Sequence, residues 1–184
     1  MITKFIDEEV KYIGSQLAPH WIYKNYKLQG DSIVAFVGEC EVKLTEMVDI
    51  EDVINNEPIY SKSMLSFITE QFNVNLIEGV FRQRLLICII KEELEKRGIF
   101  VVRNGDDLMI EGRKLTVSIA TKSHNSILIH TGINILSEGA PVKACGLTSE
   151  LGINDIKDFG MAIMKRYSDE IDDIILASTK VRGV

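Results

Sequence analysis

The sequence has no long hydrophobic run and little proline. Its longest uninterrupted apolar stretch is the six residues from Leu85 to Ile90, whereas a helix needs roughly 20 to cross a bilayer. With three prolines and no linker rich in proline, glycine or serine, the 184 residues favour a single domain over residues 1–184. Charges at Lys4 and Asp7 occupy positions where a signal peptide would be apolar. We therefore expect a cytoplasmic protein without a membrane partner.

Cysteine and histidine are also scarce, with three of each. Cys40, Cys88 and Cys145 lie far apart, and the three histidines do not complete the spacing of a zinc site. Cytoplasmic thiols stay reduced, so a cysteine that matters here acts as a free thiol. The sequence predicts no metal site and leaves any cofactor unknown.

The charge balance is acidic. Aspartate and glutamate number 27 against 21 lysines and arginines, which gives a net charge of −6. Because a nucleic-acid-binding domain carries a basic surface, a nucleic-acid partner is not expected, and a role in RNA processing is the weakest of the functions considered. Hydrophobic residues at 46% and charged residues at 26% are typical of a globular domain.

The spacing of apolar residues predicts the elements of the first half of the chain. A β-branched stretch at 31–37 predicts a strand that ends at Gly38, and residues 49–55 predict a short helix. A second helix is predicted to begin at Ser61 or Ser63, because apolar residues follow at helical spacing as far as Phe72.

A long helix at 79–97, stopped by Gly98, has the clearest periodicity. At about 100° per residue, Arg82 falls between Leu86 and Ile89, inside the apolar arc of that helix. A buried charge needs a partner, so Arg82 is predicted to contact a carboxylate or a bound anion of the substrate. The alternative is an arginine that extends to solvent or pairs near the start of the helix.

Two-residue alternation replaces helical spacing after Gly98. It predicts strands at 99–103, 108–110, 114–120 and 127–135, then a helix from Asn154 or Asp155 and a last strand at 171–177. Strands joined by short turns, with helices between them, indicate the α+β class: a mixed, largely antiparallel sheet packed with helices.

The strands at 114–120 and 127–135 are expected to form a hairpin in which Thr116 lies opposite His130. In that register one face gathers a set of small or amide side chains with one lysine and one histidine: Lys114, Thr116, Ser118, His130 and Asn134. An ordinary solvated face carries more glutamate, lysine and arginine, so the composition favours the lining of a substrate pocket. A plain solvated surface is the alternative.

Three segments carry a resemblance to a known superfamily: Gly112-Arg113-Lys114-Leu115, His130-Thr131-Gly132 and Ala144-Cys145-Gly146. In order and spacing they resemble the biotin/lipoate protein ligase and octanoyltransferase superfamily, whose catalytic core is related to the class II aminoacyl-tRNA synthetase fold. Over its whole length the chain is similar to a conserved family, domain of unknown function 366, through segments such as Pro19-His20-Trp21-Ile22-Tyr23 and Phe81-Arg82-Gln83-Arg84.

The superfamily resemblance implies roles for several residues. Lys114 takes the position of the lysine that contacts the acyl carbonyl or phosphate, and Cys145 that of the nucleophilic cysteine of octanoyltransferases. Asp107, in the turn before the lysine strand, takes a substrate-binding position. The sequence has neither the Arg-x-Gly-Gly segment of lipoate enzymes nor the Gly-Arg-Gly-Arg loop of biotin ligases, which leaves the use of ATP open.

The chemistry of Cys145 depends on a nearby cation, because a thiol with a pKa near 8.5 is mostly protonated at neutral pH. Lys114 could supply that charge, whereas Cys88 lies among apolar residues and Cys40 between two glutamates. Cys145 is therefore expected to be the most reactive thiol. The alternatives are a small buried residue for Cys145 and a surface lysine for Lys114.

Two functions of different classes fit these observations. The first is an acyl-transfer or ligase-type enzyme that acts on a small carboxylate or its thioester, with Cys145 and Lys114 as catalytic residues. The second is a non-catalytic protein of the same fold that binds or senses a small molecule. The Cys145–Lys114 pair favours the first, and the absent glycine-rich segments favour the second. Formation of a homodimer stays open.

Overall fold

The computed structural model describes residues 1–183. Its central sheet has five strands, in the order β1 (Ile2–Phe5), β2 (Ser32–Val42), β3 (Ile59–Phe72), β8 (Ser126–Asn134) and β7 (Thr116–Lys122). β1 is parallel to β2, and the other neighbours are antiparallel. A smaller sheet joins β4 (Val102–Asn104), β5 (Asp107–Ile110) and β6 (Arg113–Lys114). The fold is α+β with a mixed, largely antiparallel sheet, as the sequence predicts.

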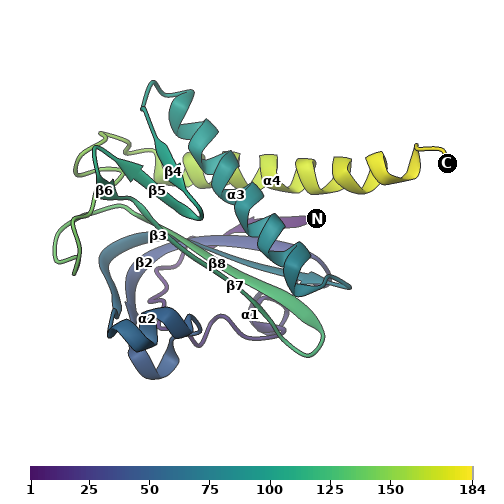
Figure 1. Cartoon of the computed structure of the whole chain (residues 1–184), viewed down its shortest axis with the longest axis horizontal. Helices are drawn as coiled ribbons and strands as arrows, with labels where there is room; N and C mark the ends of the chain where they lie inside the picture. Colours follow the sequence, from purple (N-terminus) through teal and green to yellow (C-terminus); the bar gives the residue numbers. More distant parts are fainter. Residues whose placement is uncertain (184) are drawn as a thin grey trace.

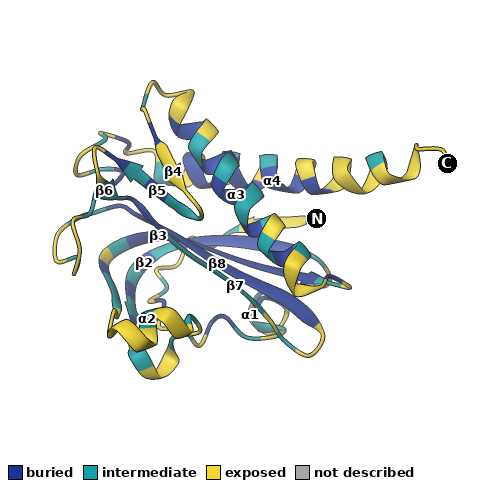
Figure 2. Ribbon diagram, viewed as in Figure 1, coloured by how far each residue is buried: buried dark blue, intermediate teal, exposed yellow. Residues whose placement is uncertain are grey.

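Two long helices cover one face of the central sheet (Figure 1): α3 (Leu76–Glu95) and α4 (Ile156–Thr179). The other face carries three short elements: α1 (Trp21–Tyr26), the 3₁₀ turn η1 (Leu44–Glu46) and α2 (Ile50–Asn55). Side chains are buried on both faces of the middle strands, so the sheet separates two apolar clusters (Figure 2). No helix of the described chain combines the length and the apolarity needed to cross a membrane.

Local signals fix the helices that the sequence predicts correctly. The side chain of Asp49 caps α2 by accepting a hydrogen bond from the backbone N–H of Glu51. The side chain of Asn75 caps α3 by accepting one from the backbone N–H of Glu78. Gly98, with a φ of +79°, follows the end of α3. α4 begins one residue after Asp155, as predicted.

The helix predicted from Ser61 or Ser63 to Phe72 is wrong, because this segment is strand β3. β3 lies in the middle of the sheet, and eight consecutive residues from Met64 to Gln71 are buried. A strand that is buried on both faces loses its polar alternation, and its apolar residues then also match helical spacing.

The last strand, predicted at 171–177, is also wrong, because α4 continues to Thr179. The β-branched pair Ile174-Ile175 favours a strand by propensity. The apolar residues Ile163, Tyr167 and Ile171 recur at four-residue steps, and the helix extends through this stripe.

β2 does not end at Gly38, as predicted, but runs through it to Val42 with a shift in register between Gly38 and Cys40. A side chain at Gly38 would lie 2.2 Å from the carbonyl oxygen of Val10. The glycine therefore admits the segment before α1, which reaches β2 through the bridge between Tyr12 and Cys40.

The predicted hairpin of β7 and β8 forms, but its register differs by three residues. Thr116 pairs with Ile133, Ser118 with Thr131, and Ile119 with His130. Because side chains alternate between the faces of a sheet, a shift by an odd number separates residues expected on one face. Thr116 and Ser118 face α3, whereas His130 and Asn134 face the opposite side with Val117 and Ile119.

Candidate small-molecule site

A cavity of about 240 Å³ lies beside the face of the sheet that α3 and α4 leave free. That volume is close to the roughly 300 Å³ at which small-molecule sites begin. Its walls come from β2, β3, β7 and β8, from the segment containing η1 and α2, and from residues 140–144. The apolar part of the wall includes Leu17, Val42, Met47, Met64, Val117 and Ile119.

His130 and Tyr12 form a stacked pair on this wall. Their ring centroids are 3.8 Å apart and their planes differ by 14°. His130 is 2% exposed, and burial lowers its pKa to about 3, so the imidazole is neutral at neutral pH. Its Nε2 lies 3.3 Å from Ser66 Oγ. The pair therefore offers aromatic surface and a neutral ring to a bound molecule, not a positive charge.

Lys114 supplies the cation of the site. Its Nζ lies 2.9 Å from Asp107 Oδ1, and both side chains are about one-third exposed at 34%. The backbone of Lys114 donates to the carbonyl of Lys143 and accepts from Cys145, which holds β6 beside residues 143–145. Of the cavity-lining residues in the described chain, Lys114 alone carries a full positive charge.

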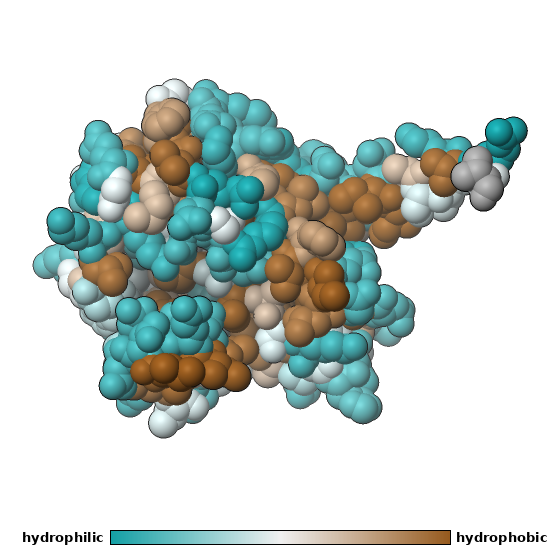
Figure 3. Space-filling model, in the orientation of Figure 1, coloured by the Kyte–Doolittle hydropathy of each residue, from teal (hydrophilic) through white to brown (hydrophobic). Residues whose placement is uncertain are grey.

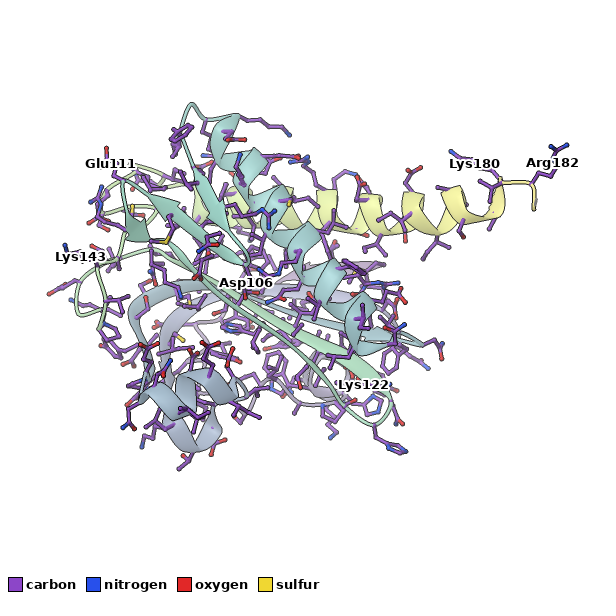
Figure 4. All side chains as sticks on the ribbon, viewed as in Figure 1. Asp106, Glu111, Lys122, Lys143, Lys180 and Arg182 are labelled. Atoms are coloured by element: carbon purple, nitrogen blue, oxygen red, sulfur yellow. The ribbon has the colours of Figure 1, made fainter. Side chains whose placement is uncertain are left out.

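Carboxylates dominate the rim. Six line the cavity: Glu46, Asp49, Asp52, Glu57, Asp106 and Asp107. Burial and the nearby Asp49 raise the pKa of Asp52. Burial also raises the pKa of Asp106, against the effect of the Arg84 guanidinium 2.8 Å away. Figure 4 shows Asp106 where β5 meets α3 and the central sheet.

Cys145 and Lys114 are neighbours in the backbone, but their side chains lie on different sides. Ala144 pairs with Lys114, and both line the cavity. The next residue, Cys145, points the other way into the apolar cluster beneath α3 and is fully buried. Burial raises the pKa of the thiol, an effect that Arg113 opposes. The structure therefore does not support a thiolate activated by Lys114. It fits the alternative, in which Cys145 is a small buried residue of the core.

The other residues predicted for the site divide into two groups. Asp107, Ser118, His130 and Asn134 line the cavity. Thr116 does not: its hydroxyl accepts the N–H of Leu108 and connects the hairpin to the smaller sheet.

Arg82 is also absent from the cavity. It lies on α3 with a side chain only 13% exposed and forms an ion pair with Glu78 at 2.6 Å. The inward orientation is therefore correct, and the carboxylate belongs to the same helix. A bound anion is not needed to explain the position.

Sequence reasoning missed Tyr12 and the acidic residues of α2. Tyr12 reaches the cavity through a bridge to Cys40, 28 residues away, which no local pattern reveals. A signal did exist for Asp49 and Asp52, because residues three apart share a helix face. Asp106 also lines the cavity, beside the expected Asp107.

Two relatives are about 40% identical to this chain over most of its length. A protein of unknown function from Pyrococcus horikoshi has 41% sequence identity and a TM-score of 0.94, over 99% of this chain and 98% of its own. An uncharacterised protein of Methanocaldococcus jannaschii is 40% identical over 92% of this chain and 79% of its own length.

More distant structures share the fold. A mutant of biotin protein ligase from Aquifex aeolicus, in complex with biotin, has a TM-score of 0.62 at 16% identity, over 94% of this chain and 70% of its own. A putative lipoate protein ligase from T. acidophilum, with bound lipoic acid, has a TM-score of 0.59 at 11% identity, over 92% and 87%. The chain thus has the fold of the biotin/lipoate ligase catalytic core. Residues 1–182 match one family over nearly the whole chain, and the protein belongs to it: Domain of unknown function (DUF366).

Proposed function

We propose that this protein is an acyl-transfer or ligase-type enzyme that binds a small carboxylate, or its thioester, in the cavity. The observation that carries the proposal is the placement of Lys114 as the single cation against an apolar wall. An ammonium at this position can hold a carboxylate or acyl oxygen, while the aliphatic body of the molecule packs on Met64, Val117 and Ile119.

Lys114 acts on the acyl group by electrostatics. When an acceptor nucleophile attacks the acyl carbon, negative charge collects on the acyl oxygen, and a fixed ammonium stabilises it. The new bond forms at the acyl carbon, the bond to the thiol sulfur breaks, and the acceptor's proton leaves with the thiol. Asp107, 2.9 Å from the ammonium, orients Lys114 for this contact. The reaction in this form needs no enzyme cysteine.

The carboxylates around the cavity influence which activated acyl group can serve as the acyl donor. Six carboxylates face one ammonium around the cavity, so a triphosphate would approach against repulsion. An acyl thioester presents an uncharged reacting group and avoids that cost. We therefore favour the thioester over a nucleotide-activated acyl group.

The second candidate is a non-catalytic binding protein of the same fold, and the ion pair favours it. Lys114 is already neutralised by Asp107, and a lysine that only fixes the cavity wall needs no substrate. A cytoplasmic location is part of both proposals.

Binding is tested with octanoate, lipoate and biotin, the first as a simple chain and the others as ligands of the structural neighbours. Calorimetry on the wild type should show binding of at least one, and Lys114→Met should weaken it at least tenfold. Lys122→Met is the matched control, because Lys122 is exposed at the far end of β7 from Asp106 (Figure 4). Equal affinities in both variants would contradict the role of Lys114.

Catalysis is tested separately, by release of free thiol from octanoyl thioesters in the presence of an amine acceptor, and by exchange of pyrophosphate into ATP with each acid. We expect thiol release that depends on Lys114 and no exchange. Binding without either reaction would leave the non-catalytic protein as the function.

A further inference from the structure

A second pocket lies on the face of the sheet that carries α1 (Figure 1), next to the end of β3. Its volume of about 560 Å³ falls within the range of roughly 300–1,000 Å³ that is typical of small-molecule sites. Glu70 in this pocket and Met64 in the first cavity lie six residues apart on β3, so about 20 Å separates the two sites. The lining of the second pocket includes three aromatic rings and two charged groups: His20, Tyr23, Phe72, Lys24 and Glu70.

Glu70 is a buried carboxylate without a cation beside it. It is 2% exposed and lies on the central strand of the sheet. Its two oxygens accept the backbone N–H of His20 at 2.9 and 3.0 Å, and Oε1 also accepts the hydroxyl of Ser126 at 2.7 Å. These donors are neutral, and no cationic group of residues 1–183 lies within ion-pair distance of the carboxylate. Because a buried charge is normally compensated by an opposite one, Glu70 favours a positively charged ligand.

A second oxygen with unused hydrogen-bonding capacity lies beside this carboxylate. Ser32 on β2 is directly opposite Glu70 and on the same face of the sheet, where such side chains begin about 5 Å apart. Ser32 is 1% exposed, and its hydroxyl has no hydrogen-bond partner in the described part of the chain. An ammonium group has three N–H donors, so it can satisfy the carboxylate and the hydroxyl together.

The aromatic rings of the pocket select the same kind of ligand. His20 precedes α1 with a φ of +62°, and the hydrogen bonds from its backbone to Glu70 hold it there. Its ring stacks on Phe72, with centroids 5.8 Å apart, and Tyr23 follows on α1. Ring faces attract organic ammonium groups. Residues 1–183 hold no cluster of three or more side chains suited to a metal ion, so an organic cation fits the carboxylate best.

Lys24 gives the pocket a charge of the opposite sign. It is exposed on α1, and its ammonium forms no ion pair within residues 1–183. A ligand with only a positive charge would be repelled by Lys24. A zwitterion can instead present its ammonium to Glu70 and its carboxylate to Lys24. The two charges of the pocket therefore favour a ligand that carries both.

The pocket differs from the exposed hydrophobic surface elsewhere on the molecule. Figure 3 shows hydrophobic residues on the projecting end of α4, where no residue from Asp172 to Gly183 is buried. Such a surface specifies only that its partner is apolar. The second pocket combines an apolar lining with a buried charge, so it specifies the charge of the ligand as well.

We propose that this pocket binds a small aromatic zwitterion of the α-amino acid type. The ammonium donates to Glu70 and Ser32, the aromatic ring packs against Phe72 and Tyr23, and the carboxylate pairs with Lys24. The proposal is independent of acyl transfer in the first cavity, because the two sites share no lining residue.

Calorimetry with four probes tests the class of ligand. The wild type should bind L-phenylalanine or L-tryptophan. Phenethylamine, which lacks the carboxylate, should bind about tenfold more weakly, because a hydrogen bond to a charged group contributes about 1.5–3 kcal/mol. 3-Phenylpropionate, which lacks the ammonium, should not bind measurably, since it places an anion beside Glu70. Failure of both amino acids to bind, or equal binding of 3-phenylpropionate, would overturn the proposal.

Variants locate the binding. Lys24→Met should weaken the amino acid about tenfold, to the affinity of phenethylamine, and should not weaken phenethylamine itself. Lys27→Met is the matched control, because Lys27 lies three residues away, is exposed and does not line the pocket. Lys114→Met should also leave the affinity unchanged. Loss of amino-acid binding in Lys114→Met, with none in Lys24→Met, would assign the ligand to the first cavity and contradict the proposal.

Glu70→Gln tests the buried charge. The amide keeps an oxygen that can accept the N–H of His20, so the variant should keep the circular dichroism of the wild type, yet it should bind neither the amino acid nor phenethylamine. Phe72→Leu is the second variant, because it leaves Glu70 in place and should weaken both ligands by removing one ring. If phenethylamine bound Phe72→Leu and a folded Glu70→Gln as tightly as the wild type, the pocket would not be its site.

Discussion

The two faces of the central sheet treat their polar side chains differently. On the face beneath α3, Ser118 bonds to Gln83, to Thr131 and to the carbonyl of His130. It also borders the cavity, from the edge strand β7, but its hydrogen-bonding capacity is used within the fold. On the other face His130, Asn134 and the rim carboxylates border a cavity. Polar residues of similar type therefore build structure on one face and a binding surface on the other, and the register of β7 on β8 decides which.

The largest expected effect compares neighbours on β3 that point to opposite faces. Leu65 is fully buried beneath the helices, and Met64 is 1% exposed but borders the cavity. Leu65→Ala should lower the free energy of unfolding by about 4 kcal/mol, near the top of the range for such truncations. Met64→Ala should cost about 2 kcal/mol, because atoms beside an existing hollow make fewer contacts. Urea denaturation measures both, and equal losses would mean that the two faces are packed alike.

The second prediction concerns the loss of stability at low pH that is caused by His130, a residue of the cavity face. Burial holds the folded pKa near 3, below the unfolded value of 6.5. Above pH 6.5 the imidazole is neutral in both states and contributes no pH dependence. Below it, the unfolded chain binds a proton that the folded chain refuses, so stability falls between pH 6.5 and about 3 by roughly 1 kcal/mol per pH unit.

The control for this pH dependence is His130→Gln, which keeps a polar side chain without the titration. Protonation of carboxylates with lowered pKa values also destabilises the protein in acid. Glu93, beside Lys96 and Arg166, is one of them, and these carboxylates are present in both the wild type and the variant. The slope of unfolding free energy between pH 6.5 and 4.5 should therefore be shallower in the variant by about one proton. Identical slopes would show that His130 binds a proton as readily in the folded protein as in the unfolded chain.

The third prediction ranks the thiols and replaces the expectation that Cys145 reacts first. Cys88 is partly exposed on α3, whereas Cys40 and Cys145 are buried. Burial, with a smaller effect from Glu39, raises the pKa of Cys40 to about 12, and burial raises that of Cys145. Iodoacetamide should label Cys88 at least about tenfold faster than the other two thiols.

Cys88→Ala provides the check on that ranking. The variant should label only when urea unfolds it, because both remaining thiols lie inside the apolar clusters. If Cys145 were labelled rapidly in the folded variant, and more slowly after Lys114→Met, Cys145 would be a reactive thiolate activated by Lys114.

Sequence patterns predict the parts of this fold that depend on local physics. α2, α3 and the start of α4 follow from capping residues and apolar stripes, which act within a few residues. β3 is missed because burial on both faces removes the alternation that identifies a strand. The end of α4 is missed because the β-branched Ile174 and Ile175 favour a strand by propensity, whereas the apolar stripe continues the helix.

The candidate site shows the same division. Composition alone points to Lys114, His130 and Asn134 as unusual for a surface, and all three line the cavity. The orientation of Cys145 depends on its pairing through Ala144 with Lys114, which is a long-range contact. Tyr12 depends on another such bridge. The face of the sheet to which a side chain points depends on how the strands pair. It is a property of the assembled sheet, and no single segment encodes it.

The smallest expected effect is that of Arg82→Met, on the helix-covered face. Its partner Glu78 is 43% exposed, so the ion pair contributes little. Its Nη1 is buried without a hydrogen-bond partner among the described residues, a burial that costs about 1–3 kcal/mol. A methionine keeps the apolar contacts of the stem and removes the unpaired donor. Loss and gain should offset, and the free energy of unfolding should change by less than about 1 kcal/mol, whereas breaking a fully buried pair costs about 3–5 kcal/mol.

Arg84→Met, two residues along α3, is the matched comparison, because the partner of Arg84 lines the cavity. Arg84 binds Asp106, whose carboxyl lines the cavity and already has a pKa raised by burial. Without the guanidinium, that pKa should rise further, and Arg84→Met should destabilise the protein more than Arg82→Met. The difference should shrink as the pH falls and Asp106 becomes protonated, because a neutral carboxyl no longer needs the cation. Urea denaturation at two pH values measures it. A larger loss for Arg82→Met would mean that the helix-covered face depends on its buried charge, and the contrast between the two faces would then fail.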